Sequence, residues 1–318
     1  MKVFLDRLTG GYANPMKDGL KWIGALDRLS ASSRVCIKPN LTFPVYRKGV
    51  MTSPTALEAI VRVLLDYTRN ITICESDSGG YNRFSMDKVF VATGIDKLKA
   101  RYGVRTLNLS GEPSRTITCR CGLRSLAVPL PITLLDETDL LITMPVPKIH
   151  MNTTVSMSVK NQWGVIQEPA QRLKLHPYFK HVIYAINKAL PPTISIIDGR
   201  YGLNRSGPLE GDPVALNWLM VADNIFAADS TCCRLMGIEP MKVPYLKFIL
   251  QRENIGQIDF NRDYRDFVCK ESFHLKRKWT DYPGLLAFNS RLAAYVGYES
   301  PLAAGLHKLL YKFRKCFY

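Results

Sequence analysis

The stretch DLLITMPVPKIHMNTTVSMSVKNQWGVIQEPAQRLKLH, residues 139–176, decides the fold class of this 318-residue chain. It opens with the apolar run 140–144, whose length is typical of a buried strand. Prolines 145 and 147 end the run, and amines and imidazoles follow at Lys148, His150, Lys160 and His176. Side chains that follow a strand of an α/β protein lie at the carboxyl end of the sheet, where such proteins place their sites. The stretch therefore predicts a cationic site after a central strand.

The same alternation of short apolar runs and helical periodicity surrounds this stretch. Strands are predicted at 34–37, 71–74 and 193–198, and helices at 54–67, 84–91 and 181–190. Thr52 or Ser53 is the expected N-cap of the first of these helices, with Pro54 in its first turn. A strand–helix–strand rhythm implies parallel pairing with helices on the sheet faces. We expect an α/β fold with a largely parallel sheet flanked by helices, arranged as two lobes with a site between them.

Three segments have other patterns. Residues 116–130 alternate and predict a strand pair that turns at 121–123, whereas 199–211, rich in glycine and polar residues, predicts a loop. Residues 217–236 predict a mostly helical stretch with a break at 222–224. We divide the chain into an α/β domain at 1–245, possible lobes included, and a basic, mostly helical C-terminal extension at 246–318.

Composition limits the partners. The chain has 43 Lys and Arg against 27 Asp and Glu, a net charge of +16, which favours anionic partners such as phosphorylated or carboxylated small molecules and acidic lipids. A generally basic surface is the alternative. No zinc-finger spacing, aromatic RNA-binding signature or basic-region helix is present, so sequence-specific nucleic-acid binding is not expected.

The sequence also predicts the location of the protein and the redox state of its cysteines. The chain begins without an apolar secretory segment and has no apolar run of 18 residues, so no membrane-spanning helix is expected. Its eight cysteines are scattered, which predicts reduced thiols in a cytoplasmic protein. No ferredoxin spacing occurs, and we therefore expect no iron–sulfur cluster.

Polar residues at the ends of the predicted strands extend the candidate site. Those suited to binding a substrate or anion are Lys38, Asn40, Thr52, Ser78, Lys148, Asn161 and Asp198. Asp77 follows a strand with Glu75 and could act as a base, although either acid could equally cap the next helix. Gly164 would allow the backbone to approach a ligand closely.

Three residues of the central stretch are expected to perform chemistry. His150 and His176 can move protons near neutral pH, and His176 can also ligate a metal. Lys160, if desolvated, can lose its proton and become a nucleophile. We predict His150, Lys160, His176 and Asp77 as catalytic residues, with an undefined cofactor that could be a divalent metal or a nucleotide-derived group.

The C-terminal segment 302–318 has the pattern of a basic amphipathic helix. Six apolar residues share one helical face: Leu302, Leu306, Leu309, Leu310, Phe313 and Phe317. Lysine and arginine lie largely elsewhere, at Lys308, Lys312, Arg314 and Lys315. Such a helix predicts peripheral contact of Leu302 to Tyr318 with an anionic membrane, or a terminal helix docked on its own core. The sequence leaves the oligomeric state open.

Taken together, these motifs resemble the family called domain of unknown function 362. The resemblance covers roughly residues 30–245. Its motifs are IKPN (37–40), TSP (52–54), ESDSGG (75–80), PKIH (147–150), VKNQWG (159–164), His176, IIDG (196–199), SGPLEGDP (206–213) and ADNIFAADSTCCRLMGIEP (222–240). Many family members carry an iron–sulfur segment that this chain lacks.

A more distant similarity is to the lactate racemase family, through the separations between His150, Lys160 and His176. That resemblance implies that His150 is a proton-transfer base, Lys160 a covalent or anion anchor, and His176 a nickel ligand or second base. The chain departs from that family at Ser158-Val159, where the family has two glycines, and at 76–78, where it has a second histidine motif.

Two functions fit the sequence. The first is an enzyme, similar to an isomerase or oxidoreductase, that acts on a small anionic carboxylate or phosphate by proton transfer or cofactor-assisted chemistry. The second is a non-catalytic protein that binds a metal, a cofactor or an anionic ligand, in contact with a membrane.

Overall fold

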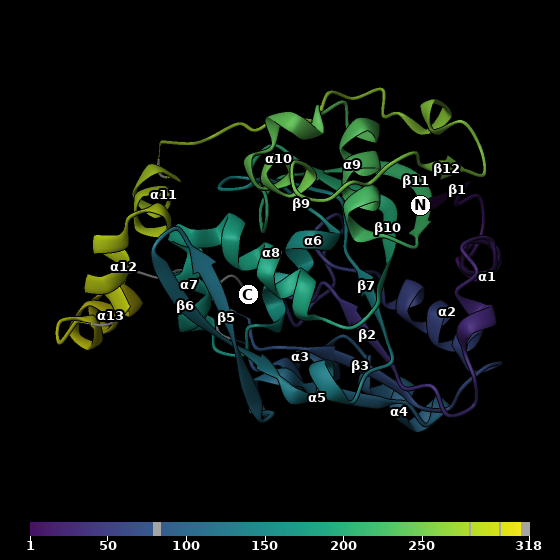
Figure 1. The fold of residues 1–318 in the computed structure, drawn as a ribbon, viewed down its shortest axis with the longest axis horizontal. Helices are drawn as coiled ribbons and strands as arrows, with labels where there is room; N and C mark the ends of the chain where they lie inside the picture. Colours follow the sequence, from purple (N-terminus) through teal and green to yellow (C-terminus); the bar gives the residue numbers. More distant parts are fainter. Residues whose placement is uncertain (79–83, 280, 299, 313–318) are drawn as a thin grey trace.

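A computed structural model of the chain describes residues 1–78, 84–279, 281–298 and 300–312. Its centre is one ten-stranded mixed sheet in the order β12-β1-β11-β10-β7-β2-β3-β4, in which β8 also pairs with β10 and β9 pairs with β8 (Figure 1). The strands of this sheet are β1 (Lys2–Arg7), β2 (Val35–Pro39), β3 (Ile71–Glu75), β4 (Arg105–Asn108), β7 (Leu140–Met144), β8 (Lys148–His150), β9 (Thr154–Ser156), β10 (Thr193–Asn204), β11 (Asp212–Ala222) and β12 (Asp259–Phe260). The predicted α/β class is confirmed.

Helices flank the sheet on both faces. They are α1 (Ala13–Trp22), α2 (Pro54–Leu64), α3 (Met86–Ala92), α4 (Asp96–Tyr102), α5 (Ile132–Asp136), α6 (Ser158–Asn161), α7 (Pro169–Leu175), α8 (Phe179–Ala189), α9 (Ile225–Leu235), α10 (Pro244–Leu250), α11 (Asp281–Asn289), α12 (Arg291–Tyr298) and α13 (Ala303–Lys312). A separate antiparallel hairpin, β5 (Ser114–Cys121) with β6 (Arg124–Pro131), confirms the strand pair predicted around residues 121–123.

Strand alternation divides the interior into two cores. Val35 and Ile37 of β2 point into a core made with α1, α2, α3 and α4, whereas Cys36 points into the core of α8, α9 and α10. Because both faces are covered, the central strands are buried throughout, as expected for parallel strands. Helix α2 fully buries Leu57 and Ile60, and each such side chain stabilises the fold by about 1.5–3 kcal/mol. The arrangement fixes the ends of β7, β2 and β3 side by side.

Two predictions about the C-terminal half of the sheet are wrong. Residues 217–222, predicted as helical, belong to β11, which pairs antiparallel with β1 and β10. Residues 218–222 are buried on both faces, and a continuous apolar run carries no periodicity that separates a strand from a helix. Part of the loop predicted at 199–211 is strand, because β10 continues to Asn204. Gly199 permits this, since a Cβ there would meet the ring of Trp218 at 2.2 Å.

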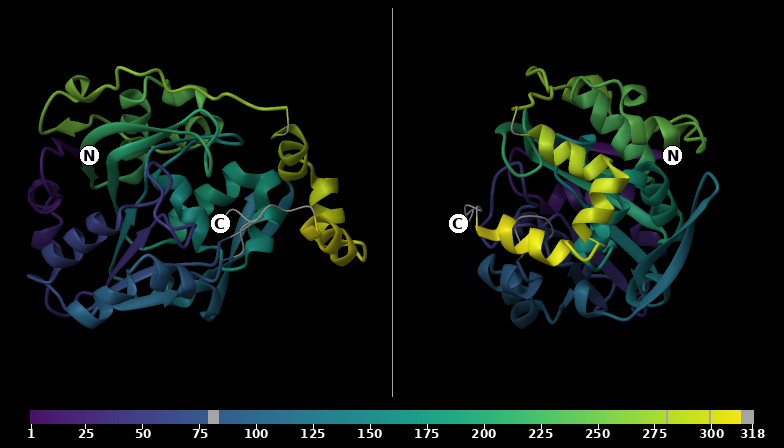
Figure 2. Two further views of the ribbon diagram at one scale, coloured as in Figure 1. Left: turned by 180° about the vertical axis from the view of Figure 1, so that it is seen from behind. Right: turned by 90° about the vertical axis from the view of Figure 1, so that its left-hand side faces the viewer.

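The last three helices lie together at one end of the molecule (Figures 1 and 2). The segment that leads to them runs along the body, where β12 pairs with β1 and where Phe267 and Phe273 are buried in the main core. The arrangement as two lobes and the boundary at residue 245 stay predictions. Of the segment Leu302–Tyr318, the structure describes α13, and the positions of Phe313, Arg314, Lys315 and Phe317 lie outside the described residues.

No helix in the described part of the chain has the length and apolar character needed to cross a membrane. Seven of the eight cysteines lie in described segments, and all seven are free thiols.

Candidate active site

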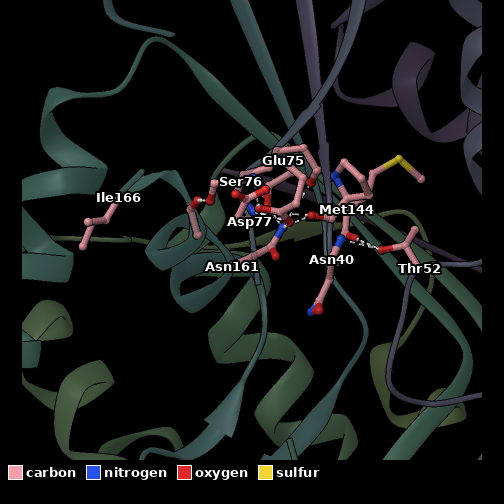
Figure 3. A network of polar contacts seen from close by, with 12 residues as sticks. Asn40, Thr52, Glu75, Ser76, Asp77, Met144, Asn161 and Ile166 are labelled. Carbon is pink, nitrogen blue, oxygen red and sulfur yellow. Dashed lines mark hydrogen bonds and ion pairs between the residues drawn. The ribbon is translucent and has the colours of Figure 1, made fainter. Parts of the chain in front are cut away.

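The carboxyl ends of three adjacent parallel strands bring the candidate residues to one edge of the sheet. Strand β2 pairs with β7 on one side and β3 on the other, so residues 38–40, 75–77 and 144 become neighbours. Figure 3 shows Asn40, Thr52 and Met144 on the right of this network, with Ser76, Asp77 and Asn161 on the left. The polar residues predicted at the strand ends therefore lie close together in the structure.

Lys38 forms a buried ion pair with Glu75. Its Nζ lies 2.8 Å from Glu75 Oε2, and the two side chains are 0% and 6% exposed. Gly164 packs directly against this pair, because a Cβ at that position would lie 2.8 Å from Glu75 Oε1 and 2.9 Å from Lys38 Nζ. The glycine predicted to admit a ligand instead makes room for a buried ion pair. The predicted anion-binding role of Lys38 stays a prediction, with its amine already paired.

Lys148 is buried among neutral partners. Its Nζ donates to Asn40 Oδ1 at 3.0 Å and to the Val50 carbonyl at 2.8 Å. Thr52 supports this arrangement, since its Oγ1 accepts from the Asn40 N–H at 2.8 Å and its hydroxyl donates to the Met144 carbonyl at 2.5 Å. Burial, followed by the charge of nearby Lys160, lowers the pKa of Lys148 to about 7.

His150 and Lys160 are in direct contact. Lys160 Nζ lies 3.0 Å from His150 Nε2. On the other side of the ring, His150 Nδ1 accepts from the backbone N–H groups of Asn152, at 3.1 Å, and Thr153, at 3.4 Å. A neutral imidazole carries one proton, and Nδ1 is used as an acceptor, so this network assigns the proton to Nε2. The Nε2–H then needs an acceptor at Lys160, which only a neutral amine provides.

The electrostatics of the pair agree with this assignment. Desolvation lowers the pKa of Lys160 from 10.5 to about 7, so the amine is largely neutral just above neutral pH. Burial lowers the pKa of His150 well below its usual value, and the charges of Lys160 and His176 add to the effect. The pair can therefore hold or release one proton near pH 7, which matches the requirement for acid–base chemistry.

His176 lies among aromatic rings. Its ring stacks on Phe179 with centroids 5.2 Å apart and contacts Trp163 at 5.7 Å and Phe288 at 5.2 Å. Burial, followed by the charge of Lys160, lowers the pKa of His176 to about 3. The imidazole is therefore neutral at physiological pH, which suits a hydrogen-bond or ligand role. Phe179 also lies 5.3 Å from Lys160 Nζ, so one ring borders both groups.

A cavity of about 470 Å³ opens beside His176. Its lining includes Asn152, Phe179 and Tyr245, with Lys180 and Arg291 as cationic members. The volume falls within the range of small-molecule sites. Asn152 connects the cavity to the amine–imidazole pair, because its backbone N–H binds His150 while its side chain faces His176.

The C-terminal extension forms part of this cavity wall. Asn289 and Arg291, at the end of α11 and the start of α12, line it. Asn289 Nδ2 donates to Asn152 Oδ1 at 3.0 Å, and Asn152 Nδ2 lies 3.3 Å from both ring nitrogens of His176. The site is therefore completed by residues far along the chain that no strand-end motif indicated.

Other predicted residues have structural partners. Asn161 Nδ2 donates to the Lys38 carbonyl at 3.1 Å and to Thr143 Oγ1 at 2.9 Å, which ties the end of β2 to β7. Asp77 Oδ1 accepts from the Met86 N–H at 2.7 Å and so caps α3. The catalytic role of Asp77 stays a prediction.

Two further candidates fix backbone segments. Ser78 binds both backbone groups of Phe84. Residues 79–83, which include Gly79 and Gly80 of the predicted motif, lie outside the described residues. Asp198 accepts from the Ser53 N–H at 2.9 Å and from the Tyr12 hydroxyl at 2.8 Å, which holds the start of α2. Burial raises the pKa of Asp198, and its described hydrogen bonds do not reach His150, Lys160 or His176.

Sequence analysis missed two residues that position the site. Asp229 of α9 is fully buried and accepts from the N–H groups of Ser158, at 2.7 Å, and Val159, at 3.0 Å, which orients the helix that carries Lys160. Burial raises the pKa of Asp229 to about 7. Arg172 donates to Ser76 Oγ and the Asp77 carbonyl, and its desolvation lowers its pKa to about 10. The only available signal for Asp229 was its place within the motif 222–240.

Across the described residues, no group of three or more His, Cys, Asp or Glu is arranged to hold a metal ion. The groups nearest His176 are an amide and aromatic rings. A metal role for His176 stays a prediction.

This fold and this cluster define an α/β protein with a buried amine–imidazole site at the carboxyl ends of parallel strands. Residues 35–234 match the family model described as Domain of unknown function (DUF362), and the chain belongs to that family. Over 114 residues it is 27% identical to a thylakoid-associated protein of Synechocystis sp., a match that covers 34% of this chain and 36% of that protein.

Two solved structures are similar in fold. Lactate racemase apoprotein from Thermoanaerobacterium thermosaccharolyticum has 14% identity and a TM-score of 0.45, covering 73% of this chain and 58% of that one. A protein of Thermotoga maritima has 14% identity and a TM-score of 0.41, covering 70% and 58%. The predicted membership of the domain of unknown function 362 family is confirmed. The chain matches about a third of its curated relative and 58% of each solved structure, and the likeness to the latter concerns the fold alone.

Proposed function

We propose that the chain is an enzyme that transfers a proton to or from a small anionic substrate, with Lys160 and His150 as the acid–base pair. The observation that carries this proposal is the 3.0 Å contact between Lys160 Nζ and His150 Nε2, in a ring whose Nδ1 is already an acceptor. An amine whose pKa is about 7 is half-protonated near neutral pH, where acid–base catalysis is most effective.

Protonation should change the position of the Lys160 amine. A neutral Lys160 accepts from the His150 Nε2–H. A protonated Lys160 has no lone pair to offer, so the contact with Nε2–H becomes repulsive and the ammonium turns towards another acceptor. We place that acceptor, a carboxylate or phosphate, in the neighbouring cavity, whose lining includes Phe179 beside Lys160 but not Lys160 itself. Proton uptake by Lys160 is thereby coupled to contact with an anion.

The surroundings support an anionic substrate. Lys180 and Arg291 contribute positive charge to the cavity lining. The charge of Lys160 adds to burial in lowering the pKa of Lys148, and an anion relieves that repulsion. His176, neutral and fixed by aromatic rings, is placed to donate to or accept from the bound molecule.

The test is hydrogen exchange at carbon. The purified protein is incubated in D₂O with a panel of small carboxylates and phosphate esters, and deuterium incorporation is followed by mass spectrometry. At least one compound should exchange, and exchange should fall by about 10²-fold or more in Lys160→Met and His150→Ala. Lys99→Met, which removes an exposed lysine of α4, is the control and should exchange as the wild type does. Exchange that survives Lys160→Met would refute the assignment.

A further inference from the structure

The three C-terminal helices carry an unusual share of exposed apolar side chains. Among the described residues, fifteen large apolar side chains are exposed, and eight of them lie between residues 279 and 309. They are Trp279, Tyr282, Leu286, Leu292, Tyr295, Leu302, Leu306 and Leu309. Scattered exposed leucines are ordinary, but a concentration of this kind indicates an interaction surface.

These side chains form stripes along the helices. Tyr282 and Leu286 are four residues apart on α11, and Leu292 and Tyr295 are three apart on α12. Leu302 lies just before α13 and is followed at helical spacing by Leu306 and Leu309. Residues three or four apart share one face of a helix, so each helix has one apolar exposed stripe.

The other sides of the same helices are used inside the protein. Ala294 of α12 is buried, and Phe288 of α11 packs its ring 5.2 Å from that of His176. Figure 2 shows α11, α12 and α13 as the outermost layer at one end of the molecule, in front of the body in its right-hand view. The apolar stripes of α11 and α12 are therefore the solvent side of two helices that pack on the body through their inner sides, and α13 continues the exposed apolar surface with Leu306 and Leu309.

The charge of this segment is strongly positive. Residues 274–318 contain eight Lys and Arg and two acidic residues. Exposed Lys276, Arg277 and Lys278 immediately precede Trp279, which is 82% exposed. Leucine stripes with tryptophan and tyrosine beside basic side chains match the depth profile of a membrane interface, where apolar groups enter the acyl boundary and cations meet headgroups.

We propose that the outer face of α11, α12 and α13, with the basic residues 276–278 beside it, docks on the surface of an anionic lipid bilayer. Charge complementarity favours this occupant, because the exposed basic residues 276–278 would attract anionic headgroups and repel the same residues of a second copy. The docked layer is the same one that contributes Asn289 and Arg291 to the cavity. The proposal concerns the surface and holds whether or not the cavity performs the proposed chemistry.

The test is co-sedimentation of the full chain with vesicles of phosphatidylcholine alone or mixed with phosphatidylglycerol. The wild type should bind the anionic vesicles about tenfold or more tightly than the neutral ones, and added salt should weaken this binding. The triple variant Leu286→Ser, Leu292→Ser, Leu302→Ser should lose about tenfold or more in vesicle affinity, because three exposed apolar anchors are removed.

A matched triple variant removes exposed apolar side chains elsewhere. Val45→Ser, Val91→Ser, Leu123→Ser should bind vesicles as the wild type does, and both triples should melt at the wild-type temperature because all six side chains are exposed. Failure of the wild type to bind anionic vesicles, or equal binding by the two triples, would overturn the proposal. A wild-type dimer in sedimentation velocity that becomes a monomer only in the 286/292/302 variant would assign the face to a second copy instead.

Discussion

Replacing Lys160 by methionine tests how far burial lowers the pKa of its amine. The native pKa of about 7 lies below the ordinary value of 10.5, which the unfolded chain has. Between these two values the unfolded state binds a proton that the folded state has released. The free energy of unfolding therefore rises with pH across this window, by at most about 1.4 kcal/mol per pH unit. Below pH 7 both states are protonated and the full penalty for burying the ammonium is present.

Integration gives the size of the effect. From about pH 7.5 to about pH 9.5 the contribution of Lys160 to the free energy of unfolding should rise by about 2 kcal/mol. Lys160→Met removes the titrating group while keeping most of the side-chain volume. The variant should therefore lack this part of the rise, and the difference between wild type and variant should change by about 2 kcal/mol over the window.

The assay is urea denaturation at several pH values at constant ionic strength, followed by tryptophan fluorescence. Lys99→Met removes an exposed lysine and should keep the pH dependence of the wild type. Parallel curves for wild type and Lys160→Met would show that the amine has an ordinary pKa when folded. That result would remove the neutral amine on which the acid–base pair depends.

Three further substitutions test the supports of the site. Glu75→Gln should destabilise the protein by about 3–5 kcal/mol in urea denaturation, because it leaves Lys38 charged and buried without a carboxylate; a loss under about 1 kcal/mol would contradict this. Gly164→Ala should cost about 1–3 kcal/mol by overpacking against the same pair, whereas Gly111→Ala, with no atom near its added methyl group, should change stability by no more than about 0.5 kcal/mol. The contribution of Asp229 to the free energy of unfolding should fall as pH rises from about 4 to about 7, because folded Asp229 retains a proton that the unfolded state releases; the stability of the wild type relative to Asp229→Asn should therefore fall over this window in a pH series of denaturation curves.

The sequence was most informative where the signal is local. The strand–helix–strand units from β2 to β3 and the helix start at Ser53-Pro54 could be predicted, because caps and periodicity depend on neighbouring residues. Strand β1 was not predicted, and residues 217–222 of β11 were predicted as helical. Both depend on pairing between residues about 200 positions apart, as in Val3 with Ala222, which leaves no local mark.

The candidate site shows the same difference between local and long-range information. The prediction that Lys148, His150, Lys160 and His176 lie near one another follows from a single strand-end connection, and the structure joins Lys160 to His150 directly. Which acid pairs with Lys38 could not be predicted, since Glu75 and Asp77 were equivalent by sequence. The contact of Asn289 with the cavity depends on how the extension folds back, and periodicity within the extension does not determine that.

The side-chain amide of Asn152 has one fixed orientation in this structure. Its oxygen is occupied by Asn289 of α11, so its NH₂ group must face His176. A donor there favours an imidazole nitrogen without a proton. If α11 moved away, the amide would be free to rotate and offer its oxygen, and an oxygen favours the protonated ring. The position of α11 therefore sets the orientation of the Asn152 amide, and the amide in turn influences the protonation of the His176 ring.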